Sequence, residues 1–562
     1  MGVDQSTSGS TAVLMDADGR ILSRCYQPLS RFAPRPGLVE QDPTEIWLVT
    51  RTAMHAAIHE AHILPEDVEA IGISNQRETS VFWDRHTGEP IGRAITWQDR
   101  RTAGFCAGTG DALRERLERE TGFVLVPNAA GPKIRWLLKY DPRVQRAAAN
   151  GDLLWGTVDT WLIWNLTGGQ AHVTDHSNAS VTMLMDARTL TYSELAVDAF
   201  EIPRSLLPGL RTSSEVYGET SPKEFLGARV PVAGCIGDQQ AALLGQGCLT
   251  AGTTKNTYGA GSFMIMNTDD RYVPPGEGIF SPVAWSAEAK VTYGLEGMSD
   301  ESGGVLDWLR DGLGIIQSAE EAEALARQVP DTAGLHFVPT LADPEAFPDQ
   351  APPHGGILMG LTHRSTRQHI TRAALEAIAF QARDLFEAIS RVGGQRPQMM
   401  RVDGGGAHND FLMQFQADLL GVPLERPADL DTIPRGAAFV AGLAVGYWES
   451  ISDVTGIWKR QQLFEPTYTE DHRETCYQGW REALAFTQSL ARPEKPRAVT
   501  TPRGLSSRSA GVKPDDRRLT ATAKLPVQPG IDPGHFDSDR SPTPGFSPQG
   551  EPVASLAHPA GA

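Results

Sequence analysis

A tight, glycine-flanked turn carries the acidic side chain whose position is best suited to chemistry. Within residues 237–246, Asp238 directly follows a glycine and leads into small residues that are typical of a helix. Well upstream, residues 74–79 read Ser-Asn-Gln-Arg-Glu-Thr, a polar cluster that contains Arg77 and Glu78. A carboxylate can take a proton from an alcohol, and an Arg/Glu pair can hold that alcohol by hydrogen bonds. The two segments together predict a phosphoryl-transfer site.

Both segments resemble the glycerol kinases of the FGGY carbohydrate kinase family, and the similarity runs from Met1 to about residue 490. The strings that carry it are residues 75–79 (Asn-Gln-Arg-Glu-Thr), 237–242 (Gly-Asp-Gln-Gln-Ala-Ala) and 256–259 (Asn-Thr-Tyr-Gly). The resemblance implies ATP- and Mg²⁺-dependent phosphorylation of glycerol to sn-glycerol 3-phosphate in glycerol catabolism. It implies that Asp238 is the general base that accepts the proton of the attacking hydroxyl.

The resemblance also assigns each kind of ligand contact to particular positions of this chain. Glycerol would be bound by Arg77, Glu78, Trp97, Asp238, Gln239 and Phe263. The nucleotide would be bound by Thr7, Ser8, Gly9, Gly259, Ala260, Gly303, Asp307, Gly405, Gly406 and Asn409. Mg²⁺ would be held by Asp4 and Asp238.

Several positions depart from the family pattern. The chain has Ser6 for a glycine, Thr11 for an arginine, Asn128 for a tyrosine, Ala260 for a threonine and Asp307 for a glutamine, and residues 342–348 replace a Gly-Leu-Gly-Ala-Pro-Tyr-Trp loop. Each lost contact to developing charge slows phosphoryl transfer by roughly 10- to 1000-fold. Two alternatives therefore stay open: a kinase for another small polyol or ketose, and a catalytically weakened nucleotide-binding regulator.

Composition limits the class of protein. The 562 residues carry a net charge of −18, which argues against nucleic acid or an anionic membrane as the main partner. No apolar run approaches the ~20 residues of a membrane span. The five cysteines are scattered without a CxxC pair, so neither a zinc site nor a disulfide framework is indicated, and a cytoplasmic location is expected. A homodimer or homotetramer is implied by the resemblance alone.

Turn and cap signals predict the elements that position the first half of the site. Residues 12–15 and the strand beginning at Arg20 flank an Asp-Gly turn, which is typical of a β-hairpin. Asp42 is the expected N-cap of a helix that begins at Pro43. Residues 68–74 are expected to form a strand that ends at the polar cluster.

The same pattern returns in the second half. Residues 257–262 form a Gly-rich bend between apolar segments, and residues 367–392 predict a long amphipathic helix. Asn409 is expected to cap a helix over residues 410–420. Strands alternate with helices throughout, so the fold class is α/β. The resemblance implies two actin-like (ribonuclease H-like) ATPase domains with an interdomain cleft.

We expect three regions along the chain. Residues 1–248 would form the N-terminal FGGY kinase domain, which binds polyol and phosphate, and residues 249–491 the C-terminal, nucleotide-binding domain. Residues 492–562 are rich in Pro, Ser, Gly, Arg and Asp. Such a segment buries too little apolar surface to offset its ordering entropy, so a disordered tail is expected.

Overall fold

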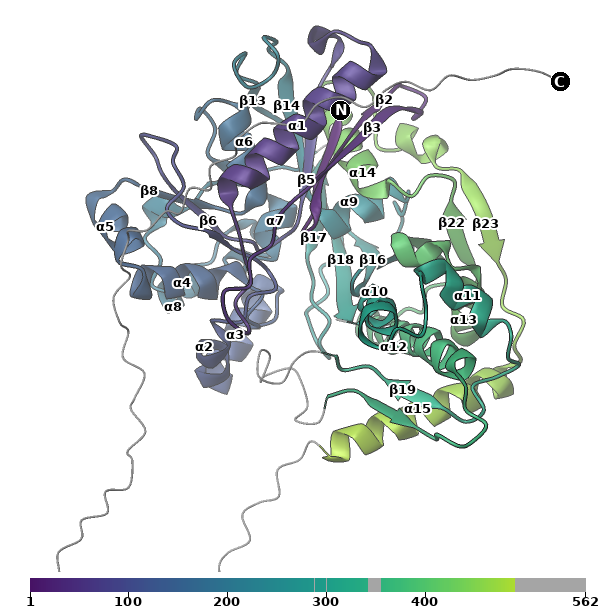
Figure 1. Ribbon diagram of the computed structural model, residues 1–562. Helices are drawn as coiled ribbons and strands as arrows, with labels where there is room; N and C mark the ends of the chain where they lie inside the picture. Colours follow the sequence, from purple (N-terminus) through teal and green to yellow (C-terminus); the bar gives the residue numbers. More distant parts are fainter. Residues whose placement is uncertain (288, 300, 342–354, 491–562) are drawn as a thin grey trace, which may run out of the picture. The chain divides into compact units, whose positions relative to one another are not determined.

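Six strands form the sheet of the first half of the chain. The computed structural model describes residues 1–287, 289–299, 301–341 and 355–490, whose ribbon is shown in Figure 1. The sheet has the order β13-β14-β5-β1-β2-β3. The predicted hairpin is confirmed, because β2 and β3 pair antiparallel across the Asp-Gly turn. The strands are β1 (Gly2–Gln5), β2 (Gly9–Met15), β3 (Ile21–Pro28), β5 (Ile71–Asn75), β13 (Ser214–Glu219) and β14 (Pro231–Gly237).

Three adjacent strands of this sheet are parallel and end at the same edge. β5 lies between β1 and β14 and pairs in parallel with both. In this register Asp4 is opposite Ser74, and Gly237 is opposite Asn75. The carboxyl ends of parallel strands meet at one edge of a sheet. Asp4, the polar cluster after β5 and Asp238 therefore share that edge.

Seven strands form the second sheet, in the order β17-β18-β16-β15-β21-β22-β23. β15 and β16 pair antiparallel around the Gly-rich bend at residues 259–261, and β15 pairs in parallel with β21. The two sheets, each mixed and each with its own hairpin, give a two-domain α/β fold. The strands are β15 (Thr254–Tyr258), β16 (Ser262–Asp269), β17 (Val283–Ala287), β18 (Lys290–Ser299), β21 (Met400–Asp403), β22 (Leu424–Pro427) and β23 (Arg460–Phe464).

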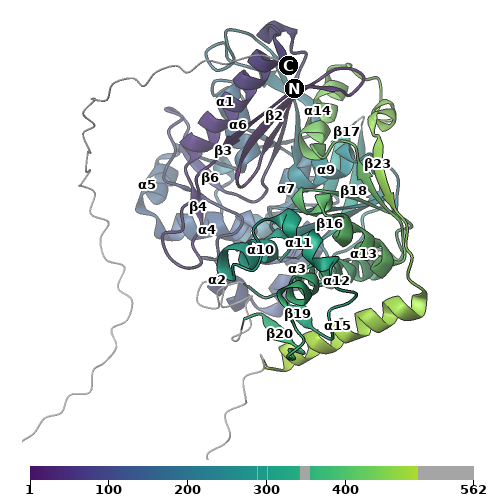
Figure 2. The ribbon, with the colours of Figure 1, turned by 45° about the vertical axis from the view of Figure 1, so that its right-hand side comes forward.

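A helix from the second half packs directly on the first sheet. α14 (Thr432–Ala444) lies against β1, β5 and β14. It is next to α9 (Asp238–Gly245), as Figure 2 shows. Gly2, Gly72 and Gly234 stand in register across these three strands. A Cβ atom at Gly72 would lie 1.9 Å from the Ala437 carbonyl oxygen. This row of glycines therefore allows the helix to approach the sheet backbone closely.

The predicted helix starts are confirmed. α1 (Pro43–Ala61) begins after Asp42, whose carboxylate accepts a hydrogen bond from the Thr44 N–H. α12 (Arg367–Gly393) is the predicted long helix. Asn409 caps α13 (Asp410–Leu420) by accepting from the Leu412 N–H at 2.9 Å.

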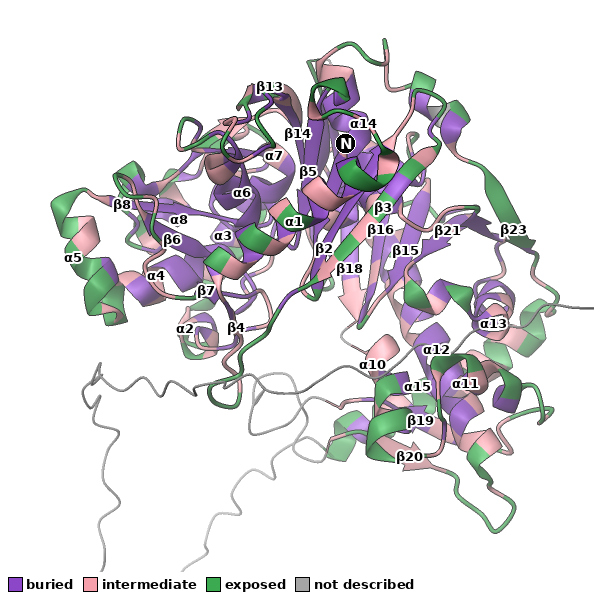
Figure 3. Cartoon of the chain, turned by 45° about the horizontal axis from the view of Figure 1, so that its top comes forward, coloured by how far each residue is buried: buried purple, intermediate pink, exposed green. Residues whose placement is uncertain are grey.

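Smaller elements surround the two sheets, whose strands are largely buried (Figure 3). Residues 65–67 form a 3-10 turn, so the strand predicted over residues 68–74 begins only at Ile71. The other strands and α-helices are β4 (Glu40–Gln41), β6 (Val81–Asp84), β7 (Ala94–Ile95), α2 (Ala103–Gly108), α3 (Asp111–Thr121), α4 (Ala130–Tyr140), α5 (Pro142–Asn150), β8 (Leu153–Gly156), α6 (Val158–Leu166), β9 (Val173–Asp175), α7 (His176–Ser180), β10 (Met185–Asp186), β11 (Thr191–Tyr192), α8 (Glu194–Ala199), β12 (Gly209–Arg211), α10 (Gly303–Asp307), α11 (Ala319–Ala326), β19 (His336–Val338), β20 (Ile357–Met359) and α15 (Glu470–Leu490).

Two expectations fall outside the described residues: the loop at 342–348 and the tail at 492–562. Among the residues that the structure does describe, no helix is both long and apolar enough to cross a membrane.

Candidate functional site

Asp238 begins α9 immediately after the last residue of β14. Its Oδ1 atom lies 2.9 Å from the Arg77 Nε and accepts a hydrogen bond from the Gln239 backbone N–H at 2.7 Å. The side chain keeps 22% of its surface exposed. The carboxylate is thus held in place on one side and accessible on the other, as a proton acceptor requires.

Arg77 forms a buried ion pair with Glu296 on β18, a residue that the sequence interpretation missed. Its Nη1 and Nη2 atoms donate to the two Glu296 carboxylate oxygens at 2.7 and 2.6 Å, and Nη1 also donates to Gln240 at 3.2 Å. Glu296 is fully buried, and Arg77 is 6% exposed. Burial disfavours the charged form of the guanidinium, but the negative charges of Glu296 and then Asp238 outweigh the effect of burial and raise the pKa of Arg77. Arg77 therefore stays charged and fixes the Asp238 carboxylate.

Glu78 lies beside a buried lysine. Burial raises the pKa of the Glu78 carboxyl to about 7, although Arg77 and Lys133 act in the opposite direction. The Lys133 ammonium donates to the backbone oxygens of Glu78 at 3.1 Å and Asn128 at 2.6 Å. Burial lowers the pKa of Lys133 to about 7. In the part of the chain that the structure describes, no protein hydrogen bond to the Glu78 carboxylate is seen, which leaves it available for ligand hydroxyls.

Trp97 and Phe263 approach each other from the two domains. Their ring centroids are 6.1 Å apart with an interplanar angle of 75°. The indole N–H of Trp97 donates to the Thr7 hydroxyl at 2.8 Å. The structure thus brings the two predicted apolar walls together and connects one of them to the β1–β2 turn.

Lys255 sets the orientation of Gln239. The Lys255 ammonium donates to the Gln239 side-chain oxygen, and also to the Thr257 hydroxyl at 2.8 Å. Because an amide presents its oxygen and its NH₂ group on opposite sides, this contact directs the Gln239 Nε2 away from the lysine. Gln239 is therefore prepared to donate a hydrogen bond to a neighbouring ligand.

Asp4 has the properties of a cation ligand. It is 8% exposed, and its Oδ1 atom has no hydrogen-bond partner among the described residues. Burial, and then the neighbouring Asp238 and Asp431, hold the pKa of Asp4 well above its ordinary value, whereas Arg24 acts in the opposite direction. Carboxylate oxygens are the ligands that Mg²⁺ prefers. A bound divalent cation would compensate this accumulation of negative charge.

Glycine-rich turns from the second domain contact one another near the predicted nucleotide positions. The Gly303 N–H donates to the Gly259 carbonyl at 2.9 Å, which fixes the start of α10 against the β15–β16 turn, where Ala260 is exposed. Gly404 has φ +82°, and a Cβ there would lie 2.6 Å from the Tyr258 carbonyl oxygen. The next glycine, Gly405, faces open space.

The remaining predicted nucleotide positions differ in their burial and in their hydrogen-bond partners. The Asn409 side-chain oxygen caps α13, but its Nδ2 is buried without a partner among the described residues. Asp307 is 62% exposed and pairs with Arg310 at 3.0 Å. Ser8 is exposed in the β1–β2 turn, where the Ser6 N–H donates to the Gly9 carbonyl at 2.8 Å.

A second residue that the sequence interpretation missed, Arg24, lies near the departure at Thr11. Asp4 is opposite Thr11, and Thr11 is opposite Tyr26 on β3. Arg24 precedes Tyr26 by two residues and so projects from the same face of the sheet. Its Nε lies 2.7 Å from the Asp431 Oδ2.

Arg24 also lines a cavity of about 500 Å³ together with Gly404, Gly405 and Arg426. Cations and exposed backbone N–H groups are the donors that recognise phosphate. Asp429 and Asp431 also line the cavity, and the two arginines are paired with Asp431 and Asp410. Arg24 nevertheless brings a guanidinium to the face of the sheet on which Thr11 provides no charge.

The missed residues had different sequence signals. Glu296 is the single carboxylate of its strand, between Leu295 and Gly297, and that contrast could have indicated it. Lys255 directly precedes the 256–259 string. Arg24 carried no signal, because its position depends on the pairing of β2 with β3.

The paired α/β domains place the chain in the class of two-domain α/β kinases. Residues 1–245 match the N-terminal domain, and residues 254–445 the C-terminal domain, of the FGGY family of carbohydrate kinases. The chain belongs to this family, and membership in a kinase family implies the use of ATP.

Relatives cover most of the described chain. "Glycerol kinase 2" of Thermotoga maritima is 45% identical over 495 residues, which are 86% of this chain and 98% of that protein. The glycerol kinase of Carboxydothermus hydrogenoformans is 44% identical over 485 residues, 86% of this chain and 97% of that protein. Among solved structures, Plasmodium falciparum glycerol kinase with ADP has a TM-score of 0.78 at 30% identity and covers 86% of this chain and 97% of that one.

Proposed function

We propose that this protein is a glycerol kinase that transfers the γ-phosphoryl group of ATP to glycerol, forming sn-glycerol 3-phosphate and ADP. The observation that carries the proposal is the position of Asp238 at the shared edge of three parallel strands, held by Arg77 and partly exposed. Support comes from relatives named glycerol kinase that match nearly their whole length.

The polyol would be held by side chains from both domains. The Glu78 carboxylate accepts hydrogen bonds from glycerol hydroxyls, and the Gln239 Nε2, directed by Lys255, donates one. Trp97 and Phe263 pack against the carbon backbone. Of the five N–H groups of Arg77, three donate to Gln240 and Glu296, and the Nε–H faces Asp238. One N–H on Nη2 is therefore left for the substrate.

Transfer requires one proton acceptor and an aligned hydroxyl. The glycerol hydroxyl oxygen forms a bond to the γ-phosphorus as the bond from that phosphorus to the β–γ bridging oxygen breaks, and ADP leaves. The hydroxyl proton passes to the Asp238 carboxylate. Asp4 and Asp238 would hold Mg²⁺, which neutralises charge on the phosphates when it is bound. Arg24 would supply a further positive charge at the phosphates.

We assign nucleotide binding to the turns that face this region. Thr7, Ser8 and Gly9 would contact phosphate from the first domain, and Gly259 and Ala260 from the second. Gly303, Asp307, Gly405, Gly406 and Asn409 would surround the adenosine. The domain boundary near residue 248, the cytoplasmic location and a homodimeric or homotetrameric assembly stay predictions.

Coupled ADP release tests the proposal directly. With Mg-ATP, we expect glycerol-dependent turnover that falls about 10²–10⁴-fold in Asp238→Asn, because the proton acceptor is lost. Asp198→Asn, which changes an exposed aspartate on α8, is the matched control and should retain activity. Turnover with another polyol or a ketose but not glycerol would reassign the acceptor. Tight ATP binding without any acceptor-dependent release would contradict kinase activity.

A further inference from the structure

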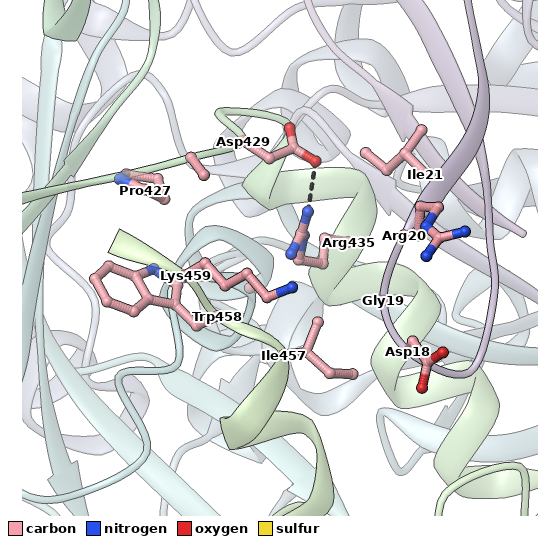
Figure 4. Close-up of a pocket in the computed structure, with 12 residues that line it drawn as sticks. Asp18, Gly19, Arg20, Ile21, Pro427, Asp429, Arg435, Ile457, Trp458 and Lys459 are labelled. Atoms are coloured by element: carbon pink, nitrogen blue, oxygen red, sulfur yellow. Dashed lines mark hydrogen bonds and ion pairs between the residues drawn. The ribbon is translucent and has the colours of Figure 1, made fainter. Parts of the chain in front are cut away.

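A second cavity lies where the β2–β3 turn of the first domain meets the second domain. It has a volume of about 240 Å³, and Figure 4 shows the residues that line it. The first domain contributes the turn residues 18–21 and Gly245, the last residue of α9. The second domain contributes residues 427–429, Arg435 and residues 457–459. It shares residues 427–429 with the cavity of about 500 Å³ described above, but it is lined by neither Asp4, Asp238 nor any of the predicted glycerol contacts.

Three cations line this cavity. Arg435, in the first turn of α14, is buried with only 9% of its side chain exposed, and its guanidinium pairs with Asp429. Its Nε has no hydrogen-bond partner among the described residues. Figure 4 shows the Lys459 side chain extending toward Arg435. Like charges that face one another destabilise a protein unless an anion lies between them.

The positive charge in the cavity exceeds the negative charge. Arg20, Arg435 and Lys459 face two carboxylates, those of Asp18 and Asp429, and Asp429 is already paired with Arg435. Neither Arg20 nor Lys459 has a carboxylate within ion-pair distance in the part of the chain that the structure describes. The lining thus contains one more cation than carboxylates, and two of the cations, Arg20 and Lys459, are exposed.

The walls fix the chemical class of the ligand. Arginine and lysine head groups together recognise phosphate, through directional donors and a point charge respectively. Ile21, Ile457 and Trp458 give an apolar side on which a short carbon skeleton can pack. The volume equals that of about eight water molecules at ≈ 30 Å³ each. It therefore admits a phosphate group and a few carbon atoms.

We propose that this cavity is a second anion-binding site, which binds a small phosphate monoester or inorganic phosphate through Arg20, Arg435 and Lys459. The two domains are in close contact beside it: a Cβ at Gly19 would lie 1.9 Å from the Ile457 Cγ2. A ligand that bridges Arg20 on the first domain to Lys459 on the second adds an attraction between them. Its binding therefore favours the arrangement of the domains in which Arg20 and Lys459 lie on the same cavity.

Calorimetric titration of the full chain with inorganic phosphate and with glycerol 2-phosphate tests the inference. ADP and glycerol are present at saturation so that the catalytic positions are filled. We expect one further site on the wild type, with the ester binding more tightly than inorganic phosphate because of the apolar wall. Lys459→Gln and Arg20→Gln should each weaken this binding about tenfold, the loss of one charge-assisted hydrogen bond.

The Arg20 and Lys459 side chains are exposed, so their variants should fold. Arg435→Gln is a third variant, and because Arg435 is buried its folding is first checked by circular dichroism. Lys139→Gln, which removes one exposed lysine of α4, should bind phosphate as the wild type does. Absence of the additional site in the wild type, or equal binding by Lys459→Gln, Arg20→Gln and Lys139→Gln, would overturn the inference. Equal affinity for the two probes would show that phosphate alone is recognised and would support the same site. None of these readouts depends on turnover, so the inference can fail while the proposed kinase activity stands.

Discussion

At the scale of single residues, Glu78 connects burial to the pH dependence of substrate binding. Because burial raises the pKa of its carboxyl to about 7, the group changes charge near neutral pH. The ionised carboxylate is a stronger acceptor of hydrogen bonds from hydroxyls than the neutral carboxyl, so the KM for glycerol should fall as the pH rises through about 7. Initial rates measured between pH 6 and 8.5 check this. A KM that stays constant over that interval would show that Glu78 does not bind the polyol.

Glu78→Gln is the accompanying variant. It should raise the KM and reduce its pH dependence near 7, since glutamine does not titrate, whereas the neighbouring Lys133, whose pKa burial lowers to about 7, still does. The raised pKa also makes the free energy of unfolding depend on pH. The contribution of Glu78 to that free energy is fully present below its ordinary pKa of 4.5 and is lost as the pH rises through about 7. Between pH 4.5 and about 7, the free energy of unfolding of the wild type should therefore decrease more than that of Glu78→Gln.

Arg24 is predicted to compensate for Thr11. Removing a cation near the transferred phosphate lowers kcat by roughly 10- to 1000-fold, so Arg24→Gln should show such a loss with the KM for glycerol unchanged. The double variant Arg24→Gln/Thr11→Arg should recover part of kcat, because the two side chains project from the same face of neighbouring strands. Arg188→Gln, at an exposed arginine, is the control. Full activity in Arg24→Gln would contradict this role.

The sequence was sufficient for some residues of the candidate site and not for others. Asp238, Arg77 and Glu78 occur in contiguous strings, so a local pattern could indicate them. Glu296 and Arg24 act through contacts made by distant strands, and a register between strands is not visible in a single sequence. The departures at Thr11 and Ala260 suggested a weakened phosphate cradle, whereas the structure places the Arg24 cation on the same face of the sheet as Thr11, on the neighbouring strand.

At the scale of elements, local signals predicted the β2–β3 hairpin and the caps of α1 and α13, since each depends on only a few neighbouring residues. The packing of α14 on the first sheet was not predictable in this way. That helix lies far along the chain from the strands it covers, and the three glycines that admit it are in register only after the strands pair.

The glycine row gives a prediction at this scale. Gly72→Ala places a Cβ 1.9 Å from the Ala437 carbonyl oxygen, so α14 must move away from the sheet. Overpacking of this kind costs about 1–3 kcal/mol or more, which should lower the thermal unfolding midpoint. Gly104→Ala is the matched control, because a Cβ there meets no atom within 4 Å. Equal midpoints for the two variants would show that the sheet and helix are not closely packed.

At the scale of the whole molecule, the two domains meet through the packing of α14 on the first sheet and through polar contacts that belong to the candidate site. The Arg77–Glu296 pair joins the edge of the first sheet to β18 of the second, and the Arg24–Asp431 pair joins β3 to the segment before α14. Trp97 and Phe263 meet in the same region. Substrate binding and the contact between the two domains therefore depend on the same side chains. An enzyme whose domains close on its substrates requires such a connection.

The Arg77–Glu296 pair provides the test of this dependence. Glu296→Gln keeps the shape of the side chain but removes the carboxylate that pairs with both Nη atoms of the buried Arg77 guanidinium, so that Asp238 is its remaining carboxylate partner. Breaking a buried ion pair costs about 3–5 kcal/mol, so the midpoint of urea unfolding should fall. Because Arg77 also fixes Asp238, kcat should fall in the same variant. The control is Glu277→Gln, which breaks an exposed pair with Arg391 at 2.8 Å. That pair is worth at most about 1 kcal/mol. If both variants unfold at the same urea concentration and retain full kcat, the buried pair neither joins the domains nor positions the base.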